Sequence, residues 1–163
     1  MTTERGTLVI GVGHPDRGDG GAGVVVVRAL GASLPPDVTT LELGDDVTRL
    51  LTLFPKAPRI LIVDAMRSGE APGTIRRYDA RSAPLPADAF RGTSMHALDV
   101  ANAIELGRAL DLLPEELLVF GIEGQEFTRG AAVSPPVSRA VPELVALVLA
   151  ELKTRGPERP VTP

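Results

Sequence analysis

The sequence predicts a single α/β domain built on a mainly parallel β-sheet. Short apolar runs alternate with longer stretches of helical period along nearly the whole chain, as in strands joined by crossover helices. The chain has 163 residues, which is long enough for one domain with a hydrophobic core and short for two. Because no internal repeat or linker divides it, we expect one domain over residues 1–155 and a disordered tail over 156–163.

The first half of the chain predicts three strands and two helices. The strands are the runs at residues 7–13, which we expect to be buried, and at 38–44 and 59–65. Residues 21–34 are predicted to be helical, because the glycine-rich loop before them overrules the strand preference of their four valines. A second helix is predicted over 45–54, with Asp45 or Asp46 near its N-cap.

The third quarter of the chain predicts an edge strand, a loop and a helix. Residues 73–80 alternate and are more polar than the other strands, which is typical of a sheet edge, and the proline-containing residues 81–90 read as a loop. A helix is then expected to run from a cap at Thr93 or Ser94 to about Leu113.

The last quarter predicts a strand and a long helix. Residues 116–124 are apolar enough for a strand buried on both faces, and the strands therefore number five. Residues 134–153 have a helical period, and we expect Pro142 to kink or restart that helix because proline lacks the backbone N–H.

Composition excludes several classes of function. The formal net charge is −4 and no long basic cluster occurs, so nucleic acid and anionic membranes are poor candidate partners. The N-terminal residues lack a signal-peptide pattern and no apolar run approaches the roughly 20 residues of a membrane helix, so we expect a cytoplasmic protein. With no cysteine in the chain, any metal here must bind to histidine and carboxylate side chains.

The candidate functional residues follow the predicted strands. In doubly wound sheets, ligands bind beyond the carboxyl ends of the strands, where consecutive connections leave on opposite faces. The residues there are mostly acidic and include both histidines: His14, Asp16, Asp19, Asp45, Asp46, Asp64, His96, Glu123 and Glu126. We call these residues the rim of the sheet, and their carboxylate and imidazole groups suit a hard or borderline divalent metal.

Each of these residues also has a structural interpretation. Asp19 is about as well suited to fastening the glycine loop, by accepting backbone N–H groups, as to binding a ligand. Asp64 reads equally as a loop acid or helix cap, and His96, in the first turn of its predicted helix, as a surface or packing residue. Glu123 and Glu126 are most simply solvated loop acids.

A nucleotide site is disfavoured by the glycine loop itself. The dinucleotide spacing G-x-G-x-x-G requires glycine where Asp16 stands, and no G-K-[ST] of a P-loop is present. The acidic side chains of the loop would also repel phosphate. We therefore consider an unrelated α/β nucleotide-binding or transfer enzyme less well supported than the two functions described below.

The glycine loop resembles a known family. The stretch VIGVGHPDRGDGGAG is similar to the N-terminal signature of the nickel-iron hydrogenase maturation endopeptidases, a strand followed by roughly G-x-G-N-x-x-x-x-D-[DE]-x-x-G. The similarity continues in order through ILIVDAMRSGEAPGTIRRYDA, TSMHALDVANAIELGRALDLLP and VFGIEGQEFTRGAAVSPPVSRAVPELV. It therefore covers nearly the whole chain.

The resemblance implies a fold and an activity. The fold is one three-layer domain, phosphorylase/hydrolase-like, with a twisted five-stranded sheet, one strand antiparallel, and helices on both faces. The activity is removal of the C-terminal extension of a hydrogenase large-subunit precursor after nickel insertion. Nickel then arrives with the precursor, and no permanently bound metal is expected. The chain is expected to act as a monomer.

The resemblance also implies three nickel-recognition residues, of which this sequence keeps two. Matched motif by motif, they fall on Asp64, on His96 and on Gly20, where the family usually has a second acid after Asp19. The missing carboxylate is replaced by a neighbour, Asp19 in preference to Asp16, or it is lost. If it is lost, the protein is a non-catalytic maturation factor that docks on the precursor without cutting it. The predicted catalytic and metal-recognition set is therefore Asp19, Asp64 and His96.

Overall fold

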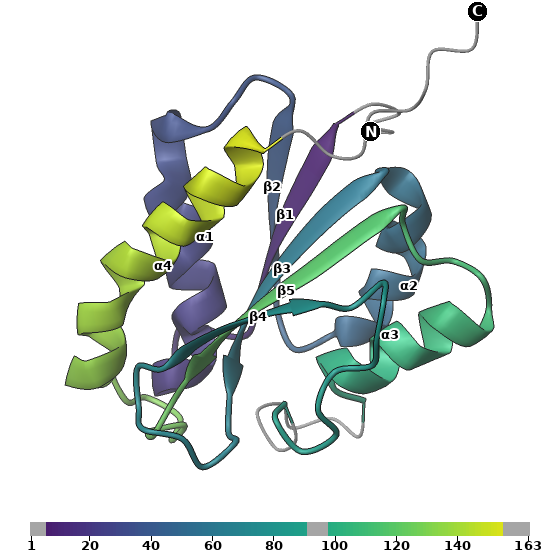
Figure 1. Cartoon of the computed structure of the whole chain (residues 1–163). Helices are drawn as coiled ribbons and strands as arrows, with labels where there is room; N and C mark the ends of the chain where they lie inside the picture. The colour runs from purple at the N-terminus through teal and green to yellow at the C-terminus, as the bar shows by residue number, and fades with distance from the viewer. Residues whose placement is uncertain (1–5, 91–97, 155–163) are drawn as a thin grey trace, which may run out of the picture.

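The computed structural model describes residues 6–90 and 98–154 and has the predicted α/β architecture (Figure 1). Five strands form one sheet in the order β2-β1-β3-β5-β4. They are β1 (Thr7–Val12), β2 (Val38–Leu43), β3 (Arg59–Met66), β4 (Ile75–Asp79) and β5 (Glu116–Glu123). β4 pairs antiparallel with β5, whereas the other neighbouring pairs are parallel, which confirms the mostly parallel sheet with one antiparallel strand.

Helices cover both faces of the sheet (Figure 1). One face carries α1 (Ala22–Leu30) and α4 (Pro135–Lys153). The other carries α3 (Val100–Ala109) and the short α2 (Leu50–Leu53), which lies between two 3₁₀ turns, Val47–Arg49 and Phe54–Lys56. No helix of the described ranges has the length and apolar character needed to cross a membrane.

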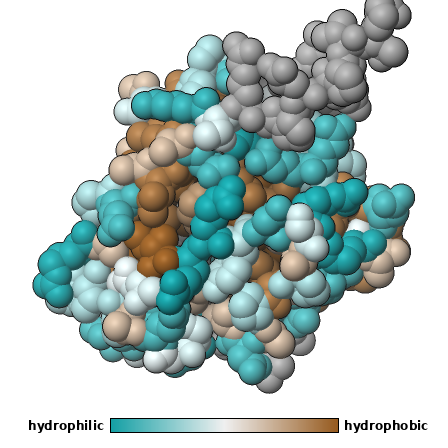
Figure 2. Space-filling model, in the orientation of Figure 1, coloured by the Kyte–Doolittle hydropathy of each residue, from teal (hydrophilic) through white to brown (hydrophobic). Residues whose placement is uncertain are grey.

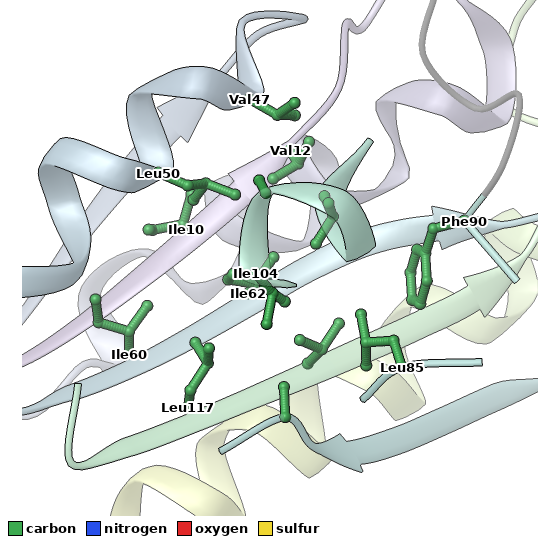
Figure 3. Packing of buried hydrophobic residues seen from close by; sticks show 14 of the residues in the cluster. Ile10, Val12, Val47, Leu50, Ile60, Ile62, Leu85, Phe90, Ile104 and Leu117 are labelled. Carbon is green, nitrogen blue, oxygen red and sulfur yellow. The ribbon is translucent and has the colours of Figure 1, made fainter. Parts of the chain in front are cut away.

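The core consists of two layers, one on each face of the sheet. Figure 3 shows Ile10, Ile62 and Leu117 of the strands facing Leu50 of α2 and Ile104 of α3. On the other face, strand residues such as Val9, Leu61 and Phe120 pack with residues of α1 and α4. Successive side chains of a strand point to opposite faces, so strands buried on both sides read as continuous apolar runs.

A groove on the α4 face shows some apolar surface. Its lining includes Ile75 of the edge strand, Phe120 of β5 and Leu147 of α4, together with Arg77 and Glu143. Figure 2 shows apolar surface among hydrophilic residues on this side of the molecule. Leu147 is 42% exposed.

The third helix begins later than predicted. Thr93 and Ser94 lie outside the described residues, but Leu98 and Asp99 are not helical and α3 starts at Val100. The N-cap is Asp99, whose Oδ1 accepts a hydrogen bond from the backbone N–H of Asn102 at 2.8 Å. The helix also ends before Leu113, because Asp111 adopts a left-handed backbone with φ 57°.

The final helix is continuous. Pro142 lies inside α4, which runs from Pro135 to Lys153 as one element, so the restart predicted at that residue is wrong. Proline removes a single hydrogen bond of the helix. Leu144, Val148 and Leu152, all buried beyond Pro142, hold the rest of α4 on the sheet. The predicted tail over 156–163 lies outside the described residues.

Candidate functional site

The candidate site lies where the ends of β1 and β3 meet. β1 stands between β2 and β3, so the chain leaves β1 toward one edge of the sheet, whereas the strands after β3 lie toward the other. This is the switch point at which α/β sheets bind ligands. A small pocket there is lined by Val12, Gly13, Gly44, Asp45, Val47, Asp64, Asp99 and Val100.

Asp64 is buried at this point, on the face of the sheet that α3 covers. It belongs to β3, in line with Ile60 and Ile62, and is only 4% exposed. Its Oδ1 accepts a hydrogen bond from the backbone N–H of Ala65 at 2.8 Å. Burial raises the pKa of this carboxyl well above its ordinary value, and the nearby Asp99 raises it further.

Asp99 is a site residue that the sequence reasoning missed. It lines the same pocket as Asp64, although the two lie 35 positions apart in the chain, and it is 9% exposed. The signal in the sequence was an aspartate in front of a helical period, a plausible N-cap, but Thr93 and Ser94 competed for that assignment. Only the position of α3 against β3 brings the two carboxylates together.

Asp19 is fully buried and fastens two loops together. Its Oδ2 accepts hydrogen bonds from the backbone N–H groups of Gln125 and Glu126 and from Ser134 Oγ, and its Oδ1 accepts one from the Ser134 N–H, all at 2.7 to 3.0 Å. Its own N–H donates to the Glu126 carbonyl at 2.7 Å. A carboxylate has about four acceptor positions. A ligand role for Asp19 therefore stays a prediction that requires it to give up one of these bonds.

The glycine loop permits a close approach between β1 and the start of α1. Gly13 has φ +114°, and a Cβ added to it would lie 1.8 Å from the Gly20 carbonyl oxygen. Gly20 itself has no positive φ, and a Cβ there would meet only Arg17 Cβ at 3.5 Å and Phe127 Cδ1 at 3.7 Å, which are ordinary contacts. The backbone conformation at position 20 therefore does not require glycine.

His14 and Asp16 lie on the exposed part of this loop and interact with each other. His14 Nδ1 contacts Asp16 Oδ1, and Arg129 Nε lies 3.8 Å from the second oxygen of Asp16. The Asp16 carbonyl accepts a hydrogen bond from the N–H of Gly130. Neither residue lines the pocket of Asp64, so the structure gives no direct support to Asp16 as a substitute ligand.

Glu123 is buried, so its interpretation as a solvated loop acid is wrong. It is 3% exposed and holds the loop after β3, accepting hydrogen bonds from the N–H groups of Ser68 and Gly69 and from Ser68 Oγ at 2.7 to 3.1 Å. Glu126 is half-buried and accepts a hydrogen bond from the Thr128 N–H at 2.9 Å, and hydrogen bonds from Thr128 lower its pKa.

The acids after β2 divide between two roles. Asp46 is exposed, immediately precedes the 3₁₀ turn before α2, as predicted, and accepts a hydrogen bond from Thr48 Oγ1. Asp45 lines the pocket of Asp64.

His96 lies outside the described residues. Within residues 6–90 and 98–154, no group of three or more histidine, cysteine, aspartate or glutamate side chains is arranged to hold a metal ion. The acids that the structure does bring together are Asp45, Asp64 and Asp99, which line the same pocket.

Known proteins with similar sequences and folds include hydrogenase maturation proteases. A putative hydrogenase maturation protease of Methanocaldococcus jannaschii is 29% identical over 154 residues, covering 90% of this chain and 96% of that protein. A solution structure of an endopeptidase from Escherichia coli is 27% identical with a TM-score of 0.77, covering 91% of this chain and 92% of that one. The [NiFe] hydrogenase maturation protease HybD from Thermococcus kodakarensis is 25% identical with a TM-score of 0.65, covering 91% and 99%.

The family model described as hydrogenase maturation protease matches residues 24–151. This match spans more than half of the chain and includes β2 to β5, the buried Asp64 and most of α4. The chain therefore belongs to the hydrogenase maturation protease family.

Proposed function

We propose that this protein is an endopeptidase that removes the C-terminal extension of the nickel-loaded large-subunit precursor of a nickel-iron hydrogenase. Membership of the family supports proteolysis in hydrogenase maturation. The observation that carries the proposal to a site is Asp64, a carboxylate held almost out of solvent at the switch point of the sheet, where ligands of α/β proteins bind. An acidic chain without cysteine suits a reaction in the cytoplasm, and we propose that it acts there as a monomer.

The chemistry follows from the residues at this rim. Asp64 supplies a negative charge, and His96 would supply a neutral imidazole, which is a good nickel ligand. Nickel enters as part of the substrate, so the protein needs only the ligands that the precursor leaves open. A nickel ion held by these residues would supply Lewis-acid chemistry, either on the scissile carbonyl or on the attacking water. Burial raises the pKa of Asp64, and the positive charge of a metal favours the ionised carboxylate that acts as a ligand.

The decisive experiment is incubation of the purified protein with nickel-loaded precursor, followed by mass spectrometry of the released C-terminal peptide. We expect release from the nickel-loaded precursor and none from the nickel-free precursor. Elemental analysis of the isolated protein should show no stoichiometric nickel or zinc, because the metal arrives with the substrate. One tightly held metal ion per chain would instead indicate an ordinary metallopeptidase.

The alternative function is a non-catalytic maturation factor. One observation favours it: this chain has Gly20 at the position where the nickel-iron hydrogenase maturation endopeptidases usually have a carboxylate. Such a factor forms a stable complex with the nickel-loaded precursor and releases no peptide. The same incubation, analysed by size-exclusion chromatography, separates the two functions.

Asp64→Ala and His96→Ala are each expected to abolish peptide release, lowering the rate at least about 100-fold, because each removes a proposed metal contact. Asp37→Ala, at an exposed residue before β2, is the matched control and should cut at the wild-type rate. Circular dichroism should show that all three variants are folded. An undiminished rate for either site variant would remove that residue from the proposed site.

A further inference from the structure

Asp64 and Asp99 place two carboxylates in one small pocket. Both side chains are at least nine-tenths buried, with exposures of 4% and 9%. The pocket that they line has a volume of about 10 Å³, close to the minimum that one water molecule needs. The rest of its lining consists of a third acid, Asp45, of Gly13 and Gly44, and of the apolar residues Val12, Val47 and Val100. Because Asp64 and Asp99 are themselves buried, little solvent screens their two charges.

Each carboxylate has one oxygen without a partner in the described part of the chain. Asp64 Oδ1 accepts from the Ala65 N–H and Asp99 Oδ1 from the Asn102 N–H, each at 2.8 Å. No donor within residues 6–90 and 98–154 bonds to either Oδ2, and no lysine, arginine or histidine there forms an ion pair with either side chain. Two buried carboxylates that face one pocket repel each other unless a proton or a cation lies between them.

We propose that Asp99 is a second carboxylate ligand for the divalent metal that Asp64 meets, and that it supplies the charge missing at Gly20. The inference rests on the proposed function, because nickel in the precursor is the metal that it names. The hydrogen bond from Asn102 fixes Oδ1 of Asp99, so the side chain is already oriented and its other oxygen remains available. Two carboxylates at one point give a nickel ion two negative charges and hard oxygen ligands.

The inference is tested by titrating Ni²⁺ alone into the full-length protein by isothermal calorimetry, comparing wild type with Asp99→Asn. Asparagine is as good an N-cap as aspartate, so this variant keeps α3 and removes only the charge. Asp46→Asn is the matched control, since Asp46 is also an acid that starts a helical turn but does not line the pocket. Cleavage of nickel-loaded precursor is measured on the same three proteins.

We expect Asp99→Asn to unfold at or above the wild-type temperature and to bind Ni²⁺ at least about tenfold more weakly. Asp46→Asn should bind as wild type does. If Asp99 only caps α3, or only shares a proton or a water with Asp64, Asp99→Asn will bind Ni²⁺ with undiminished affinity, and this overturns the inference. A wild-type protein that shows no Ni²⁺ binding also overturns it.

The cleavage measurement tests the proposed function separately. If Asp99→Asn binds Ni²⁺ more weakly than wild type but wild type never cuts the precursor, Asp99 is supported as a second ligand and the endopeptidase function is refuted. If wild type and Asp99→Asn cut the precursor at equal rates and bind Ni²⁺ with equal affinities, the endopeptidase function is supported and the role of Asp99 as a ligand is refuted.

Discussion

Asp19 and Asp64 are both buried aspartates near the glycine loop, yet their surroundings differ. Asp19 accepts four hydrogen bonds, which compensate the carboxylate for the water that it has lost. Asp64 accepts one, from its own neighbour, and lines a small pocket. A charge that the fold leaves poorly compensated is typical of a functional site, whereas a saturated one is typical of a structural residue.

The raised pKa of Asp64 predicts that Asp64→Asn stabilises the protein at neutral pH. The folded state holds this proton more tightly than the unfolded state, so the stability that Asp64 contributes is fully present below about pH 4 and is lost as the pH rises through its folded pKa. Asparagine keeps an acceptor for the Ala65 N–H and carries no charge.

Urea denaturation of wild type and Asp64→Asn at pH 4, 5.5 and 7 measures this effect, with the exposed Asp37→Asn as control. The gap in unfolding free energy should widen with pH only for Asp64→Asn, which should also fail to cut the precursor. A gap that is constant with pH would show that Asp64 is ionised throughout.

Gly20 provides a second prediction at this scale, which rests on the role proposed for Asp99. A Cβ at Gly20 meets no atom closer than 3.5 Å, so Gly20→Asp should change the unfolding free energy by no more than about 1 kcal/mol. In wild type it should raise kcat/KM less than about threefold, because Asp99 already supplies the charge. In the Asp99→Asn background, adding Gly20→Asp should raise kcat/KM about tenfold. A large gain in wild type alone would mean that the missing acid is an uncompensated defect.

At the scale of elements, the loop after β1 and the segment from β5 to α4 act as one unit. Backbone bonds join them from Gly18 N–H to the Ala131 carbonyl and from Asp19 N–H to the Glu126 carbonyl, at 3.0 and 2.7 Å. Ser134 is the N-cap residue of α4, but its Oγ donates to Asp19 instead of accepting from the helix. The Asp19 carboxylate thus lies at the N-terminus of a 19-residue helix, where negative charge is favourable.

Asp19→Asn should therefore lower stability more than Ser134→Ala does. The NH₂ group of the asparagine would replace an oxygen that accepts hydrogen bonds, so a donor would point at donors. This costs about 2–4 kcal/mol of unfolding free energy. Ser134→Ala loses only the Oγ bond and should cost about 1 kcal/mol, since the Ser134 N–H still reaches Oδ1. Guanidinium denaturation measures both. If Asp19→Asn is as stable as wild type but inactive, Asp19 is a ligand after all.

At the scale of the whole molecule, the two ends of the sheet have different roles. The carboxyl ends of β1 and β3 hold the candidate site, whereas Arg59, at the first residue of β3, lies at the opposite end. Arg59 Nη2 donates to the Glu151 carbonyl at 2.8 Å and Nη1 to the Thr154 carbonyl at 3.1 Å, which anchors the end of α4. Its Nε lies 2.9 Å from Glu116 Oε2, although without hydrogen-bond geometry.

Arg59→Ala should reduce stability without changing catalysis. It leaves carbonyl groups and the half-buried Glu116 without their cation, at a cost of about 3–5 kcal/mol, typical of a broken buried pair. Thermal unfolding should show the loss, while kcat/KM per folded molecule at low temperature stays within about twofold of wild type. Arg49→Ala, at an exposed position, is the control for charge. A lower kcat/KM in Arg59→Ala would show that the two ends of the sheet are coupled.

The sequence by itself determined the class of fold, the five strands and the position of Asp64, because these depend on local periodicity and on where an apolar run ends. Tertiary structure decided which acids matter and how. Asp99 reaches Asp64 only because α3 packs on β3, and Asp19 and Glu123 are buried only because loops distant in the chain fold over them. Burial and hydrogen-bond partners set the free energy of a charged group, and for Asp19 and Glu123 the partners come from segments far away in the sequence.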